Sequence, residues 1–73
     1  MEKFNLQQLN SLHNSVHQME IRLNGLMMYL ENIEFEEDEQ QKKYYQKCLE
    51  EELERFNYYE NLFIKQIKEI EGE

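Results

Sequence analysis

The sequence predicts an all-α protein, a two-helix antiparallel hairpin with coiled-coil-like packing that dimerises into a four-helix bundle. Two long stretches place apolar residues at helical spacing, and a dense acidic segment separates them. The chain has two glycines and no proline, so it lacks the turn residues that a β-sandwich needs. Apolar residues make up 40% of it, which is too many for a disordered tail even though 33% of the residues are charged. We therefore expect one folded unit over residues 1–73.

The first helix is expected over about residues 3–34. Its apolar residues are spaced alternately by three and four positions without a break, which is the a/d pattern of a heptad seam. No clear capping box marks its start. The seam consists of Leu9, Leu12, Val16, Met19, Leu23, Leu26, Leu30 and Ile33.

A turn is expected over about residues 35–38. Ile33 and Leu49 are separated by two heptads plus two residues, and two residues rotate a helix by about 200°. A continuous helix would therefore place its two apolar stripes on opposite sides. Residues 34–39 also include five carboxylates, which repel one another along a continuous helix. A hairpin avoids both problems, and a continuous helix paired in a longer assembly is the alternative.

The second helix is expected over about residues 39–71, with Asp38 as its N-cap and Gly72 ending it. A turn near residues 36 and 37 places residue i beside residue 73 − i, which pairs Met19 with Leu53. The seam of this helix has one polar position, at Glu60, and otherwise consists of Leu49, Leu53, Phe56, Phe63, Ile67 and Ile70.

The sequence holds more apolar surface than one helix–helix seam uses. Ile21, Met28 and Phe35 follow one another seven residues apart outside the seam, and Gly25 beside them offers room for a second backbone. A homodimer would bury this surplus in a four-helix bundle. The alternative is a docking face for another protein, because Tyr and Met are enriched at interfaces.

The charge of the chain suggests what kind of partner it has. A rod with a net charge of −8 can present carboxylates to a basic nucleic-acid-handling protein, such as a defence nuclease. In this hypothesis the protein is an acidic inhibitor or adaptor, and its AT-rich amino-acid usage suggests a phage or mobile element. Acidity that only provides solubility is the alternative. Carboxylates would steer association and aromatic and Met side chains would anchor it, so the predicted partner-binding residues are Met28, Tyr29, Phe35, Glu36, Glu37, Asp38, Glu39, Tyr44 and Tyr45.

Other chemistries find little support in the sequence. Lys42, Lys43 and Lys47 form a basic cluster that nearby acids cancel, so no direct binding of nucleic acid is expected. Cys48 has no histidine near it in sequence and is interpreted as a packed thiol, so neither an enzyme nor a cofactor is expected. No apolar run reaches 18 residues and no signal-peptide core opens the chain, which favours a cytoplasmic protein without a membrane span.

His13 and His17 lie four residues apart on one face of the first helix, with Glu20 three residues further on. A metal-binding helical bundle is one interpretation of this spacing, although we assign no metal ligands. The others are surface residues without a role, and a polar pair between His13 and Glu60 that fixes the helix register. A purely structural homo-oligomerisation module is the rival to every partner-binding function.

Overall fold

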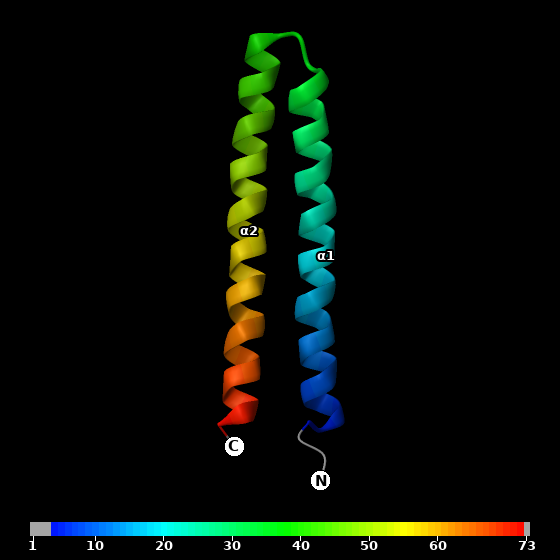
Figure 1. The fold of residues 1–73 in the computed structure, drawn as a ribbon, viewed down its shortest axis with the longest axis vertical. Helices are drawn as coiled ribbons and strands as arrows, with labels where there is room; N and C mark the ends of the chain where they lie inside the picture. The colour runs from blue at the N-terminus through cyan, green and yellow to red at the C-terminus, as the bar shows by residue number, and fades with distance from the viewer. Residues whose placement is uncertain (1–3, 73) are drawn as a thin grey trace.

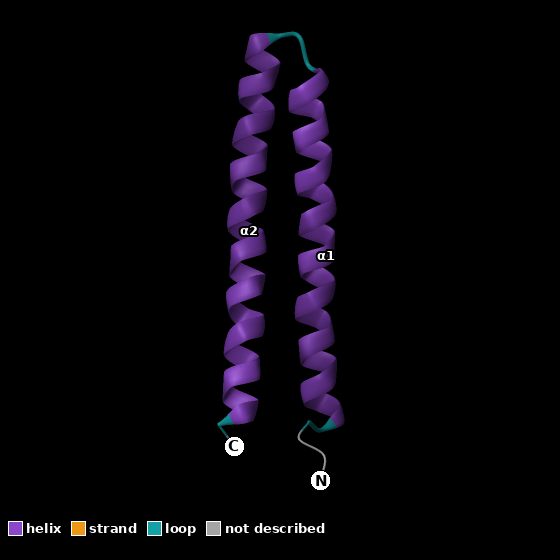
Figure 2. Cartoon of the chain, viewed as in Figure 1, coloured by secondary structure: helices purple, strands orange, loops and turns teal. Residues whose placement is uncertain are grey.

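The computed structural model describes residues 4–72, which form two long antiparallel helices (Figure 1). Helix α1 (Leu6–Phe35) and helix α2 (Glu39–Glu71) lie side by side along their length and are joined by a short turn (Figure 2). The hairpin measures 57 × 15 × 13 Å. The predicted all-α hairpin is confirmed, and the alternative of one continuous helix is wrong. Within residues 4–72, neither helix has a stretch long and apolar enough to cross a membrane.

Helix α1 begins with a capping box that the sequence analysis did not expect. Asn5 Oδ1 accepts a hydrogen bond from the Gln8 backbone N–H over 2.8 Å, and Gln8 Oε1 accepts one from the Asn5 N–H over 2.9 Å. The two side chains satisfy two backbone donors that the first turn leaves free. The expectation that no capping box marks the start was therefore wrong. The start expected near residue 3 lies outside the described residues, and Phe4 and Asn5 precede the helix.

The turn consists of three residues, 36–38, one fewer than predicted because Phe35 still belongs to α1. Glu36 caps α1 by donating its backbone N–H to Asn32 O over 3.0 Å. Asp38 caps α2, as predicted, because its carboxylate accepts from the Gln40 N–H over 3.0 Å. At the far end Gly72 ends α2, also as predicted, and its N–H donates to a backbone carbonyl of the last turn.

The register of the two helices differs from the predicted pairing of residue i with residue 73 − i. That rule places residues 58 and 48 beside Ser15 and Gly25, whereas the structure places Gln66 and Glu52 there. The two helices are therefore displaced by more than one turn at Ser15 and by about one turn at Gly25. Met19 is half-buried, whereas Leu53, its predicted partner, is 47% exposed. The prediction assumed a reversal symmetric about residues 36 and 37, whereas α2 extends beyond the end of α1 at the turn (Figure 1).

Candidate functional site

The two helices bury only part of the apolar seam that the sequence aligns. On α1, one row of that seam is buried or half-buried against α2, namely Leu12, Met19, Leu26 and Ile33. The other row keeps 37–54% of each residue exposed to solvent and consists of Leu9, Val16, Leu23 and Leu30. Among the described residues, Leu12 and Ile70 alone are both apolar and buried. One hairpin therefore leaves half of its best apolar stripe in water.

Polar residues fill the other half of the helix–helix contact. Ser15 is only 3% exposed, and its hydroxyl donates to Gln66 Oε1 over 2.8 Å. The apolar pattern alone does not indicate these positions. Their spacing of seven residues is the sequence signal that could have identified them. On α1 the polar row consists of Gln8, Ser15, Arg22 and Tyr29, and on α2 of Tyr45, Glu52, Tyr59 and Gln66.

The apolar stripe of each helix therefore points between the other helix and one open side of the hairpin. On α1 an exposed apolar row comes one residue after the polar row, as Val16 follows Ser15. The corresponding row of α2 is mixed and consists of Gln46, Leu53, Glu60 and Ile67. Because the helices run in opposite directions, rows offset by the same step lie on the same side. We call this side the apolar face, and it consists of Leu6, Leu9, Val16, Leu23, Met27, Leu30, Leu53, Ile64 and Ile67.

Near the end that holds residues 7–18 and 59–70, the opposite side of the hairpin is mostly polar. Two shallow, open grooves run along it there and share Ser11 and Gln66. This part of the hairpin is therefore amphipathic. The remaining lining residues are Gln7, Gln8, Asn14, Ser15, Gln18, Tyr59, Leu62, Glu69 and Ile70.

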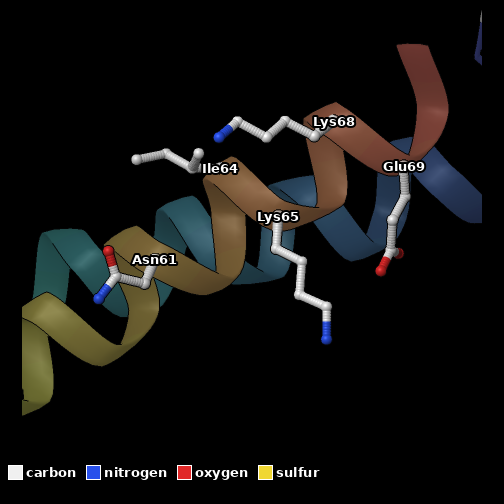
Figure 3. A pocket seen from close by; sticks show the side chains of 5 residues that line it. All are labelled: Asn61, Ile64, Lys65, Lys68 and Glu69. Carbon is white, nitrogen blue, oxygen red and sulfur yellow. The ribbon is translucent and has the colours of Figure 1, made fainter. Parts of the chain in front are cut away.

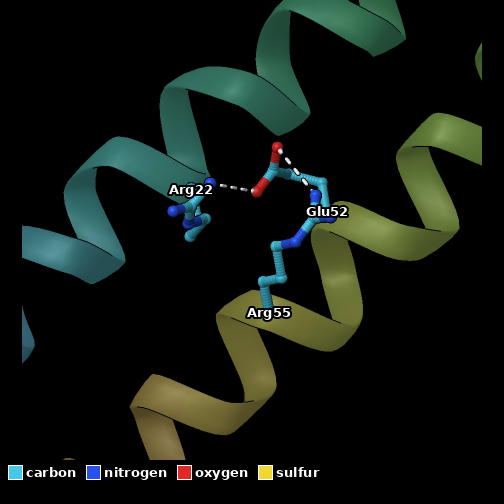
Figure 4. A network of polar contacts seen from close by, with 3 residues as sticks. All are labelled: Arg22, Glu52 and Arg55. Atoms are coloured by element: carbon cyan, nitrogen blue, oxygen red, sulfur yellow. Dashed lines mark hydrogen bonds and ion pairs between the residues drawn. The ribbon is translucent and has the colours of Figure 1, made fainter.

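An ion-pair network lies near the middle of the helix–helix contact (Figure 4). Arg22 Nη1 of α1 is 3.0 Å from Glu52 Oε1 of α2, and Arg55 Nη1 is 4.0 Å from Glu52 Oε2. Glu52 is only 8% exposed and packs against Gly25. Gly25 thus makes room for a carboxylate, not for a second backbone as the sequence suggested. Such a pair adds little net stability, because burying charges costs desolvation free energy.

The predicted acidic cluster is split by the structure into residues with local roles and residues facing solvent. Glu36 Oε1 accepts from the Asp38 N–H over 3.1 Å, and Asp38 is the α2 N-cap. Glu39 forms an ion pair with Lys42, with 3.7 Å between Oε1 and Nζ. These carboxylates thus hold the turn in place, and the N-terminal end of α2 favours the negative charge of Asp38 and Glu39. Glu37 is exposed at the apex of the turn.

The structure brings three of the five predicted anchor residues together, since the ring centroids of Tyr44 and Tyr45 are 5.8 Å apart and Tyr29 lies near Tyr44. Met28, Phe35 and Tyr44 are exposed, and Phe35 is 78% accessible. Tyr29 and Tyr45 are half-buried members of the polar rows instead. None of the five belongs to the apolar face, which the sequence analysis did not identify as a binding surface.

Tyr29 and Tyr44 contact the half-buried thiol of Cys48 from the two helices. A hydrogen bond with Cys48 is the main cause that raises the pKa of Tyr44 above its ordinary 10.0. Partial burial is the main cause that raises the pKa of Tyr29, followed by the nearby Cys48 and Glu52 charges. Cys48 is a packed thiol between two phenols, consistent with its interpretation from the sequence.

His13 and His17 are exposed on α1, with nearly parallel rings whose centroids are 6.4 Å apart. No group of three or more potential metal ligands converges anywhere within residues 4–72. Glu60 is half-buried. The polar pairs that cross between the helices include Arg22 with Glu52 and Ser15 with Gln66.

A further hollow lies on the outer side of α2 near its C-terminal end (Figure 3). Its five lining residues all come from this one helix, so it is a surface depression between side chains. Two of them are the lysines Lys65 and Lys68, and the nearby Glu69 and Glu71 balance their charge. The lining residues are Asn61, Ile64, Lys65, Lys68 and Glu69.

Comparison with known proteins adds no relative, since no family model, curated protein or solved structure matches this chain. Function is therefore argued from the physical features of the hairpin alone. Among these features is the apolar face, and exposed apolar patches of this kind mark interaction surfaces.

Proposed function

We propose that this protein is a protein–protein interaction module that works as a homodimer, with two hairpins joined through their apolar faces into a four-helix bundle. The observation that carries the proposal is the direction of the apolar stripes. Each heptad stripe points between the neighbouring helix and the open side, which is where the centre of a four-helix bundle would lie. In such a bundle the exposed leucine row and the half-buried row of α1 would face one core.

The surface area of the hairpin supports the same proposal. The chain exposes 6006 Å², whereas a compact monomer of 9.1 kDa exposes about 4,900 Å². Two faces of 57 × 15 Å would together bury on the order of 1,700 Å², which is the size of a standard specific interface.

Light-scattering mass measurement across a dilution series tests this function. The wild-type protein is expected at twice the 9.1 kDa chain mass. Replacing Leu23 and Leu30 with Glu places two charges in the apolar face and should give a monomer with reduced helix content, since a buried unpaired charge is strongly destabilising. The matched control replaces Gln18 and Asn24 with Glu, which adds the same charge outside the apolar face and should leave the dimer intact.

Two results would contradict this function. The first is a wild-type protein that has the mass of one chain at every concentration and is nevertheless fully helical. The second is equal dissociation of the two double variants, which would mean that net charge, not the apolar face, controls assembly.

The distribution of charge favours a second candidate function, docking on a basic protein such as one that handles nucleic acid. The chain carries −8 overall, and the exposed Glu34 and Glu37 at the turn end are free of the capping roles that occupy Glu36 and Asp38. Such charges raise the rate of association with an oppositely charged partner. The exposed Met28, Phe35 and Tyr44 lie toward the same end and provide apolar contact area. They are outside the apolar face, so this function is compatible with a homodimer.

A further inference from the structure

The side of the hairpin opposite the apolar face changes character along its length. It is mostly polar where Gln7 and Asn14 of α1 line its grooves. The same row of α1 continues at seven-residue spacing with Ile21, Met28 and Phe35, so these side chains lie on that side in the half of the hairpin that holds the turn. They are 42%, 51% and 78% exposed. The row thus changes from amides to exposed apolar side chains toward the turn.

Helix α2 adds two side chains to the same area. Cys48 belongs to the α2 row of Leu62 and Glu69, which line the grooves, and it contacts Tyr29 between the helices. Tyr44 forms a hydrogen bond with Cys48 and is 58% exposed. Exposed patches of apolar and aromatic side chains mark interaction surfaces. We call this patch the turn face, and it consists of Ile21, Met28, Phe35, Tyr44 and Cys48.

The length and direction of the turn face fit an α-helix. Ile21 and Phe35 are fourteen residues apart on α1, which corresponds to about 21 Å along the helix axis. The contributions of α1 and α2 both run along the hairpin, so a third helix lying in the same direction contacts both. Recognition of an amphipathic helix by such a surface is a common mode of peptide binding.

The charge around the turn face favours a basic partner over a second copy of the chain. Residues 20–58 hold eleven acidic and five basic residues, and therefore carry −6 of the net charge of −8. Three of the five basic residues, Arg22, Lys42 and Arg55, already form ion pairs with glutamates. Both halves of this chain are net acidic, so a second copy is repelled from the turn face, whereas a helix rich in Lys and Arg is attracted.

We propose that the turn face binds a basic amphipathic helix of another protein. Met28, Phe35 and Tyr44 contact the apolar stripe of that helix, and the surrounding carboxylates attract its Lys and Arg side chains. The unbranched side chain of Met28 adapts to the shape of the residues it meets. This inference rests on the second candidate function, docking on a basic protein, and does not depend on the homodimer, because the turn face and the apolar face lie on opposite sides.

Methionine methyl NMR with a synthetic peptide tests the proposal. The probe is a helical peptide of about 18 residues with Leu at a/d spacing and Lys elsewhere, long enough to cover the turn face. The matched peptide has Glu in place of Lys. Met27 belongs to the apolar face and Met28 to the turn face, so the ¹³C-labelled methyl groups of these neighbours report which side the peptide contacts. The Lys peptide should shift the Met28 signal and leave that of Met27 unchanged, and the Glu peptide should bind at least about tenfold more weakly.

Matched substitutions measure the apolar contact. Met28→Ala shortens a side chain of the turn face, and Met27→Ala shortens the same kind of side chain on the apolar face. In fluorescence anisotropy with the labelled Lys peptide, Met28→Ala combined with Phe35→Ala should weaken binding by about tenfold or more, whereas Met27→Ala should leave it nearly unchanged. The substituted side chains are exposed, and circular dichroism shows whether each variant is as helical as the wild type.

The contrary outcomes separate this proposal from the function on which it rests. A Lys peptide that binds but shifts the Met27 signal, or neither signal, overturns the turn face as the site and leaves docking on a basic protein in place. Equal binding of the two peptides, or no binding of either at millimolar concentration, overturns both. A light-scattering mass above twice the 9.1 kDa chain mass for the wild-type protein would mean that another copy covers the turn face, which also overturns the proposal.

Discussion

Substitution of Gly25 by Ala has opposite expected effects depending on Glu52. An Ala at position 25 of the helix gains about 1 kcal/mol over Gly from helix propensity. The added Cβ would, however, lie 3.1 Å from Glu52 Oε2 and 3.3 Å from its Cδ and Cγ. Glu52 has little freedom to move because Arg22 holds its carboxylate at 3.0 Å, and overpacking of this kind costs about 1–3 kcal/mol. We therefore expect Gly25→Ala to destabilise the wild-type protein by about 1 kcal/mol.

A double-mutant cycle with Glu52→Ala measures this contact. Once the carboxylate is removed, Gly25→Ala should stabilise the hairpin by about 1 kcal/mol, which gives a coupling free energy of about 2 kcal/mol. Urea unfolding of the four proteins, followed by circular dichroism, provides the values. All four must be compared at one protein concentration, since self-association makes stability depend on it. Equal stabilisation by Ala in both backgrounds would refute the tight packing of Glu52 against Gly25.

Two further predictions concern the turn end of the hairpin. Reversing Glu34 and Glu37 to Lys should leave the thermal unfolding midpoint nearly unchanged and weaken the salt dependence of association with a basic protein. An unchanged salt dependence would exclude steering by the turn. Asp38→Ala removes the N-cap of α2 and should lower the free energy of unfolding by about 1 kcal/mol, measured by thermal circular dichroism. The hydrogen bond with Cys48 raises the pKa of Tyr44 above 10.0, so this bond stabilises the fold below that pH and the stabilisation is lost as pH rises through the raised pKa. In Cys48→Ala the pKa of Tyr44 should return toward 10.0 in an NMR titration of its ring, and no change would mean that the bond does not set it.

The hairpin and its ends were predictable from the sequence because they depend on local chemistry. The phase difference between Ile33 and Leu49 and the repulsion among carboxylates 34–39 both require a reversal at this place. Asp38 and Gly72 are residue types that commonly end helices, and both occupy the predicted caps. The Asn5–Gln8 capping box has the same local character, and its Asn-x-x-Gln spacing is a readable signal that was not used.

The rotation and register of the helices were not predictable from the apolar pattern. A heptad stripe shows which side of a helix avoids water, but it does not show whether one neighbour or two cover that side. Here the stripe is divided, with Leu12 buried and Leu9 exposed. The polar contact between Ser15 and Gln66 joins positions that an apolar pairing rule ignores. The observed register thus includes polar contacts between residues far apart in the sequence, which a helix-by-helix apolar pattern does not contain.

The paired ends of the hairpin have a practical consequence for engineering. Phe4 and Gly72 lie at one end of the hairpin, and the three-residue turn lies at the other (Figure 1). A short flexible linker can therefore join the first and last residues, and the chain can be opened within 36–38 to give a circular permutant with the helices in reversed order. In that permutant Asp38 precedes α2 at the new N-terminus, so its side chain can still accept from the Gln40 N–H. Glu36 then lies at the other end of the chain and is no longer held next to the Asp38 N–H, from which it accepts a hydrogen bond in the intact turn. A permutant opened in the turn therefore separates two roles of the carboxylates. Glu36 can no longer stabilise the chain reversal, whereas Asp38 can still cap α2.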